Sequence, residues 1–212
     1  ISLLGYDKLA LVGHSLGGFD ARLFAYTYPK ETAGLLLLDP PTENIYRRMH
    51  SPPDEDVDLY KRCGELVQHH ALGWDSKCLD LRVGSRWPGA MKTKLLADQQ
   101  KPSWYETIVS EDISMVTRSA DELAGAHRPL GSIPIIVLQA ETDCAGAAPK
   151  SFDAQRCAEL ESQARDSTRG VKRIVAGASH DIQGDKPDAV LDAFREIVQA
   201  ARTSGLATAE PN

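Results

Sequence analysis

Residues 13–17, Gly13-His14-Ser15-Leu16-Gly17, place a serine between two glycines, after an apolar run and before an amphipathic stretch. A serine hydroxyl is a weak nucleophile at neutral pH, so it needs a base beside it and a backbone that makes it protrude. A tight strand-to-helix turn meets the second need. The G-x-S-x-G spacing alone occurs by chance in roughly one chain in fifteen of this length. The alternative is a glycine-rich phosphate cradle, but neither G-x-G-x-x-G nor a P-loop lysine is present.

An acid and then a histidine follow later in the chain. This is the order typical of proteins with a G-x-S-x-G turn between a strand and a helix. His180 lies in a loop after an apolar run and before the last helical pattern. Asp143 follows the buried run "IPIIVLQ", and we expect it to be the acid that orients His180. Glu141 in the same loop is the nearest alternative. Asp39 after "LLLL" is another, because an acid that follows the preceding strand could also reach the histidine. Each candidate acid could instead be a turn residue, and His180 could instead be a surface residue.

The remaining histidines favour structural roles. The side chain of His14, next to the serine, should point away from the substrate and pack. His69 and His70 lie in a polar helical stretch without a third ligand at useful spacing, so the sequence predicts no metal site. No cofactor is needed for the chemistry that Ser15, His180 and an acid would perform.

Short apolar runs alternate with helical patterns, which is typical of a parallel α/β sheet. Continuous apolar runs such as "LLLL" indicate strands that are buried on both faces. The predicted strands are 9–12, 35–38, 133–139 and 171–175, and the predicted flanking helices are about 16–26 and 187–201. Their carboxyl ends would bring the serine, the acids and the histidine to one edge of the sheet.

Strand signals are absent between the second and third predicted strands, and helical patterns replace them. We therefore divide the chain into core residues 1–40, a helical lid insertion 41–129, core residues 130–203 and a frayed polar tail 204–212. Ser103–Glu106 fits a capping box at a helix start. The lid aromatics Trp74, Trp87, Trp104 and Tyr105 could line an acyl pocket or pack a small core.

Four cysteines allow three pairings. A helix, a turn and a returning segment would bring Cys63 and Cys78 together, which leaves Cys144 and Cys157 as a second pair. The alternative is four reduced thiols. Paired cysteines would favour an extracytoplasmic location, whereas reduced ones favour the cytoplasm.

Composition bounds the function. The chain has 212 residues, 42% hydrophobic and 25% charged, with a net charge of −6. An acidic chain without a basic face argues against a nucleic-acid partner. No apolar run is long enough for a transmembrane helix. The sequence does not indicate an oligomeric state.

The segments "DKLALVGHSLGGFDARLFAYTYPKETAGLLLLDP" and "SHDIQGDKPDAVLDAFREIV" resemble the nucleophile-elbow and histidine-loop segments of the α/β-hydrolase superfamily. The resemblance implies Ser15 as the nucleophile, Asp143 as the acid, His180 as the base and the Leu16 backbone N–H as an oxyanion donor. It also implies that 41–129 is the lid that these enzymes insert between two strands of the sheet.

The chain departs from the family before the elbow strand. Only "ISLLGYD" precedes that strand, where family members carry about four strands and a loop with the second oxyanion donor. We therefore expect the C-terminal half of an α/β-hydrolase sheet, about four parallel strands, in a piece of a longer hydrolase that is inactive alone. Strand 9–12 should be an edge strand and Ser15 unusually exposed.

The sequence thus predicts a serine hydrolase that acts on a small-molecule carboxylic ester through an acyl-enzyme. Amide hydrolysis, acyl transfer and cofactor-free haloperoxidase chemistry use the same three residues and stay open, as does a non-catalytic binding protein of this fold. An aspartate at the elbow would have suggested a dehalogenase or epoxide hydrolase, and Ser15 argues against both.

Overall fold

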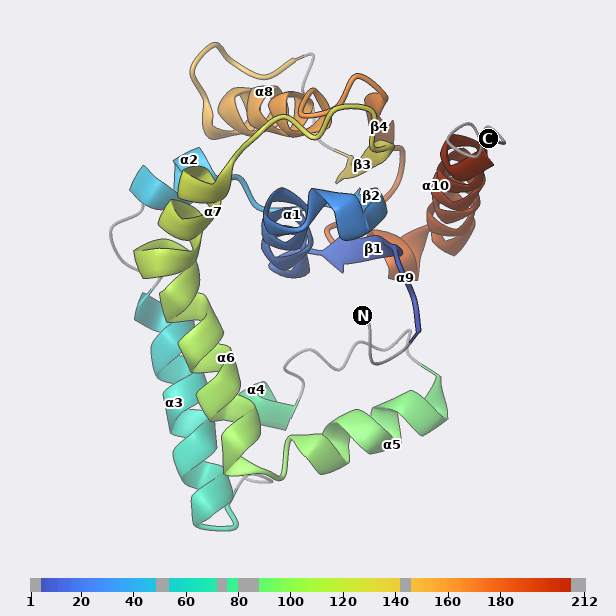
Figure 1. Ribbon diagram of the computed structural model, residues 1–212. Coiled ribbons are helices and arrows are strands. Elements are labelled where there is room, and N and C mark those ends of the chain that lie inside the picture. The colour runs from blue at the N-terminus through green and yellow to red at the C-terminus, as the bar shows by residue number, and fades with distance from the viewer. Residues whose placement is uncertain (1–4, 49–53, 72–75, 80–87, 142–145, 207–212) are drawn as a thin grey trace. The chain divides into compact units, whose positions relative to one another are not determined.

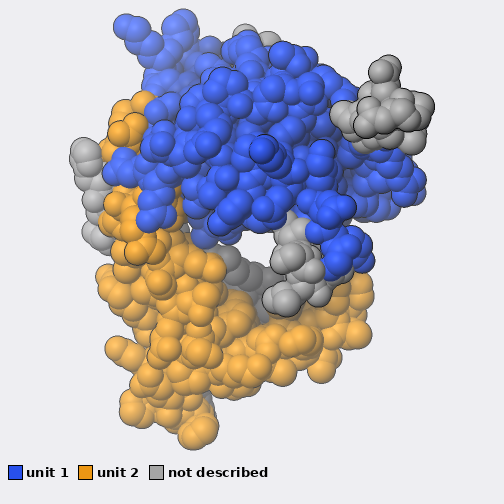
Figure 2. Space-filling view, in the orientation of Figure 1, with its two compact units in different colours: residues 1–46, 120–212 blue, residues 47–119 orange. Residues whose placement is uncertain are grey.

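The computed structural model describes residues 5–48, 54–71, 76–79, 88–141 and 146–206. They fall into two compact units, one of residues 1–46 and 120–212 and the other of residues 47–119, coloured separately in Figure 2. The second unit lies within the sequence range of the predicted lid, 41–129, and covers a shorter range than predicted. No described helix is long and apolar enough to cross a membrane.

The first unit is built on a parallel sheet with strand order β1-β2-β3-β4. This confirms the predicted four-stranded α/β core. Its strands are β1 (Leu9–His14), β2 (Thr32–Leu38), β3 (Ile135–Ala140) and β4 (Gly170–Val175). Its helices include α1 (Gly17–Thr27), α7 (Ala120–Ala126), α8 (Phe152–Ala164), α9 (Ile182–Asp185) and α10 (Pro187–Leu206), with a short 3-10 turn at Pro29–Glu31. The helix α2 (Glu43–Arg48) begins in this unit and ends just past its boundary.

The two central strands are buried on both faces, as their continuous apolar sequences predict. Alternate residues of β2 point to opposite sides, so Leu36 and Leu38 pack with Ile197 of α10 in one core cluster. α1 and α8 cover the other face of the sheet, and α10 covers this one (Figure 1). Phe194 of α10 does not belong to this cluster and is 38% exposed.

β1 lies at the edge of the described sheet. It pairs with β2 only, among the residues that the structure describes, which confirms the expected edge position. Val12 on this strand is 49% exposed. Ser15, however, is half-buried rather than unusually exposed. α10 continues to Leu206, so the helix extends into the predicted polar tail.

The second unit is helical. It contains α3 (Asp54–Gln68), α4 (Ser76–Leu79), α5 (Gly89–Asp98), α6 (Pro102–Ser114) and the π-helical turn Met115–Ser119. α6 begins one residue before Ser103, with Pro102 in its first turn and no side-chain cap, so the predicted capping box is wrong. Proline is well suited to that first position because its missing N–H has no partner in a helix anyway.

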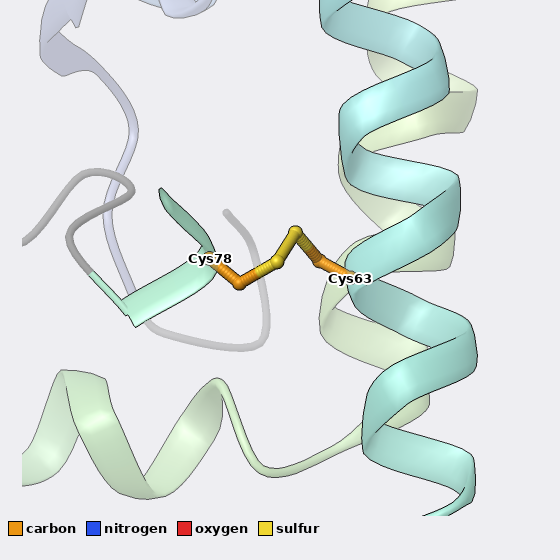
Figure 3. The surroundings of a disulfide bond; sticks show 2 residues. All are labelled: Cys63 and Cys78. Carbon is orange, nitrogen blue, oxygen red and sulfur yellow. A yellow bond between two sulfur atoms is a disulfide. The ribbon is translucent and has the colours of Figure 1, made fainter. Parts of the chain in front are cut away.

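A disulfide joins α3 to α4 in this unit. Cys63 and Cys78 are bonded, with their Cα atoms 5.6 Å apart (Figure 3), which confirms the predicted bridge. Tyr105 is buried against both cysteines and Trp104 packs beside them. These two lid aromatics therefore serve packing, whereas Trp74 and Trp87 lie outside the described residues. No described cysteine is free, and Cys144, the predicted partner of Cys157, lies outside the described part of the chain.

Candidate active site

Ser15 occupies a sharp turn between β1 and α1. Its φ is 51°, in the left-handed region, which a serine adopts only at a cost of about 1–2 kcal/mol. The turn is so tight that a Cβ on Gly13 would lie 2.2 Å from the Gly17 carbonyl oxygen. Gly17 itself needs no such space, since a Cβ there meets no described atom within 4 Å. The first glycine of the motif is thus the one that the turn requires.

Asp39 follows β2 directly, and it is the second residue at this edge with left-handed backbone, at φ 43°. Its side chain is only 5% exposed. The Ala140 N–H, at the end of β3, donates a 2.9 Å hydrogen bond to Asp39 Oδ1. The carboxylate therefore lies over the carboxyl end of the neighbouring strand.

His180 meets this carboxylate from the loop after β4. Its Nδ1 lies 2.6 Å from Asp39 Oδ2, and the two residues are 141 positions apart in the chain. An ionised carboxylate only accepts hydrogen bonds, so Nδ1 is the donor and Nε2 carries the free lone pair of the neutral ring. The imidazole is 57% exposed, so that Nε2 can act as a base toward a group in the adjoining cavity.

Asp39 is held in its ionised form. Burial raises the pKa of this carboxyl, but hydrogen bonds from His180, Arg156 and the Ala140 N–H, together with the charge of Arg156, outweigh burial and lower it. At neutral pH the buried group is therefore an anion with three donors. Such a group fixes the tautomer of a histidine and stabilises the imidazolium that forms when the ring takes a proton.

In the structure His180 thus contacts Asp39, which the sequence indicated as an alternative acid. Glu141, the other alternative, binds the loop backbone: its Oε2 accepts a 2.7 Å hydrogen bond from the Gly177 N–H. Asp143, the acid expected first, lies outside the described residues, and its role stays a prediction. Glu141 supports the histidine loop, whose Gly177 has the left-handed φ of 69°.

Ser15, Asp39 and His180 all line one cavity of about 230 Å³ within the first unit. Its other lining residues are Pro40, Pro41, Ile45, Tyr46 and Phe152, together with the polar Thr42 and Arg156. Phe152 is 60% exposed at the rim. A serine and a histidine that open into the same partly apolar space are placed to act on one small organic substrate.

Two residues at this site were missed or misread from the sequence. His14 was expected only to pack, yet its Nε2 lies 2.9 Å from the His180 carbonyl oxygen, with the two rings 4.8 Å apart. Arg156 had no sequence signal, because its partner Asp39 is 117 positions away. His69 and His70 are exposed at the end of α3, and no metal-binding cluster of three residues occurs in the described ranges.

Leu16, whose backbone N–H is expected to be an oxyanion donor, lies at the N-terminal end of α1. Leu16 is the residue before the first turn of α1, where backbone N–H groups and the positive end of the helix dipole face the serine. Asp20 is the acidic residue in that first turn. The position of the Leu16 N–H at the N-terminus of α1 is consistent with a site that stabilises a negatively charged oxygen.

Solved structures with this arrangement of elements come from several hydrolases. A Pseudomonas aeruginosa protein described as an epoxide hydrolase matches with a TM-score of 0.65 at 18% identity, over 95% of this chain and 69% of that one. A carboxylesterase from Nitrososphaera gargenis matches at 0.57 and 11%, over 96% and 69%. An epoxide hydrolase from Bacillus megaterium matches at 0.53 and 18%, over 94% and 72%. At these identities the likeness concerns the fold.

No curated protein sequence matches the chain significantly. A family model, by contrast, matches nearly all of it. The model of the alpha/beta hydrolase family aligns with residues 1–193, which include the serine turn, the second unit and the histidine loop. The match, the sheet order and the position of the serine turn agree, and the chain belongs to the alpha/beta hydrolase family.

Proposed function

We propose that this protein is a serine hydrolase that cleaves carboxylic esters through an acyl-enzyme, with Ser15 as nucleophile, His180 as base and Asp39 as the acid that orients His180. One observation carries the proposal. Nδ1 of His180 is bound to a buried carboxylate at 2.6 Å, while the ring and Ser15 line the same cavity. Fold alone would not support it, because this fold serves many functions.

The reaction follows from the protonation states at the site. Ser15 Oγ attacks the ester carbonyl carbon as its proton passes to Nε2 of His180, and the carbonyl oxygen becomes an oxyanion at the start of α1. The oxyanion collapses, the C–O bond to the alcohol breaks, and His180 returns the proton to the leaving alkoxide. Water, activated by His180 in the same way, then hydrolyses the acyl-serine.

The serine distinguishes this proposal from the chemistry named for the epoxide hydrolases among the similar structures. Ester cleavage is the activity named for the Nitrososphaera gargenis carboxylesterase, and it suits a serine nucleophile. The cavity of about 230 Å³ supports short acyl groups over long ones. Acyl transfer and amide cleavage would use the same acyl-enzyme, and no described residue favours either.

The test is a panel of p-nitrophenyl esters with acyl chains of two to twelve carbons, assayed on the full-length protein. We expect turnover highest on the shorter esters and a fall in kcat of several orders of magnitude for Ser15→Ala. Ser110→Ala, on the exposed side of α6, is the matched control and should leave turnover unchanged. Full activity in Ser15→Ala would overturn the proposal.

A further inference from the structure

Arg156 lines the cavity and contacts the candidate acid directly. It lies on α8, and its Nη2 is 2.7 Å from Asp39 Oδ1. The side chain is 15% exposed and the carboxylate 5%, so that this ion pair is largely shielded from water. Shielded, charge-assisted hydrogen bonds are among the strong ones in proteins.

The donors divide the Asp39 carboxylate into two halves. Oδ1 accepts from Arg156 and from the Ala140 N–H at 2.9 Å, whereas Oδ2 accepts from His180 alone among the described contacts. With both donors on Oδ1, the plane of the carboxylate is fixed and Oδ2 faces the imidazole. Without Arg156, a single backbone hydrogen bond would hold that orientation.

We propose that Arg156 is a positioning residue, which holds Asp39 in the orientation that His180 needs and sets the pH range over which His180 acts as a base. The inference rests on the proposed function for its effect on turnover. Arg156 acts through Asp39 and is therefore distinct from the residues that touch the reacting atoms.

The electrostatic part has a definite sign. The Arg156 guanidinium partly neutralises Asp39, so the carboxylate attracts the His180 imidazolium less strongly than a bare aspartate would. Removal of Arg156 should therefore make the protonated ring more stable and move its titration to higher pH. Other charged or titratable groups around His180 and its loop stay the same in each variant: His14, Glu141, Asp181, Asp185 and Lys186.

The experiment compares Arg156→Gln, Arg156→Lys and Arg165→Gln with the parent protein. Arg165 ends the same helix and is paired with Glu161 at 3.6 Å, so its variant matches the charge change without contacting Asp39. The first readout is NMR of the His180 ring proton against pH in a Ser15→Ala background, which needs no turnover. The second is the pH profile of kcat/KM with Ser15 present.

For Arg156→Gln we expect the midpoint of the His180 titration and the acidic limb of kcat/KM to rise together by about half to one pH unit. We also expect kcat to fall about tenfold, as for one lost charge-assisted hydrogen bond. Arg156→Lys should keep the parent midpoint and lower kcat less, and Arg165→Gln should match the parent in both readouts.

An unchanged midpoint in Arg156→Gln overturns the proposal. So does a rise in KM confined to esters that carry a carboxylate, since Arg156 would then be a substrate contact. If Arg156→Gln does not fold, Arg156→Lys decides: parental kcat contradicts positioning, and a lowered kcat at an unchanged midpoint supports it. Failure of the proposed function appears separately, as ester turnover that survives Ser15→Ala.

Discussion

Nε2 of His14 lies 2.9 Å from the backbone carbonyl oxygen of His180, across 166 positions of sequence. His14, which is next to Ser15 in the sequence, thereby connects the turn after β1 to the loop that contains His180. Since a carbonyl oxygen only accepts, Nε2 of His14 is the donor. His14→Phe keeps a ring against His180 and removes that donor, so kcat/KM on a short ester should fall about tenfold. An unchanged kcat/KM would show that the contact has no role in positioning.

The choice of acid is testable with a matched pair of variants. Asp39→Asn should lower kcat by about three to four orders of magnitude, because an amide no longer stabilises the imidazolium or fixes the ring tautomer. Asp143→Asn makes the same chemical change one strand along and should cost less than about threefold. Steady-state kinetics at pH 8 separates the two. Loss of activity in Asp143→Asn alone would restore Asp143 as the acid.

The serine turn predicts an asymmetry between two glycines. Gly13→Ala forces a Cβ to 2.2 Å from a backbone oxygen, so the turn must move, and we expect a loss of more than about 2 kcal/mol in the free energy of unfolding. Gly17→Ala places its Cβ where no described atom lies within 4 Å, and stability should change by less than about 0.5 kcal/mol. Urea unfolding measures both, and equal losses would contradict this geometry.

A buried ion pair away from the cavity makes stability depend on pH. Arg22 binds both carboxylate oxygens of Glu43, at 2.7 and 2.8 Å, and Arg22 is 2% exposed. Burial raises the pKa of Glu43, but the hydrogen bonds and charge of Arg22 outweigh it, and the net pKa is lowered. This contribution is complete above the pKa of the unfolded chain and is lost as pH falls through the folded value.

Glu43→Gln should therefore destabilise the protein by about 1–3 kcal/mol at pH 7, since the buried Arg22 guanidinium loses its bidentate carboxylate and is left with the more distant Asp166, whose Oδ2 lies 3.8 Å from Nη2. The difference from wild type should shrink as pH falls toward 3. Glu106→Gln, exposed on α6, is the control and should show neither effect. Denaturant unfolding at several pH values gives the comparison, and a difference that grew at low pH would contradict the assigned direction.

The bridge of the helical unit should stabilise that unit. Cys63 and Cys78 are 15 positions apart, and closing a loop of this size contributes about 3 kcal/mol in the chain-entropy model. Cys63→Ser with Cys78→Ser should therefore increase hydrogen exchange in α3 and α6 while β2 and β3 stay protected. Unchanged exchange in α3 would show that packing around Tyr105 is sufficient by itself.

The sheet was predictable because its strands carry their own signal. β2 and β3 are uninterrupted apolar runs, and their carboxyl ends had to bring the serine, the acids and the histidine to one edge. The choice of acid was not predictable in the same way. Asp39, Glu141 and Asp143 all follow adjacent strands, and the contact of His180 with Asp39 depends on the left-handed backbone of Asp39 and on Arg156, which reaches it from α8. Such side-chain geometry leaves no periodic pattern in a single sequence.

The central claim, that His180 activates Ser15, is tested most directly by covalent labelling of the full-length protein with a fluorophosphonate, read by peptide mass spectrometry. A fluorophosphonate modifies a serine only when a base makes it nucleophilic. We predict stoichiometric label on the peptide that contains Ser15, no label in Ser15→Ala, and labelling at least about a hundredfold slower in His180→Gln. Label on another serine, or undiminished labelling in His180→Gln, would contradict the account.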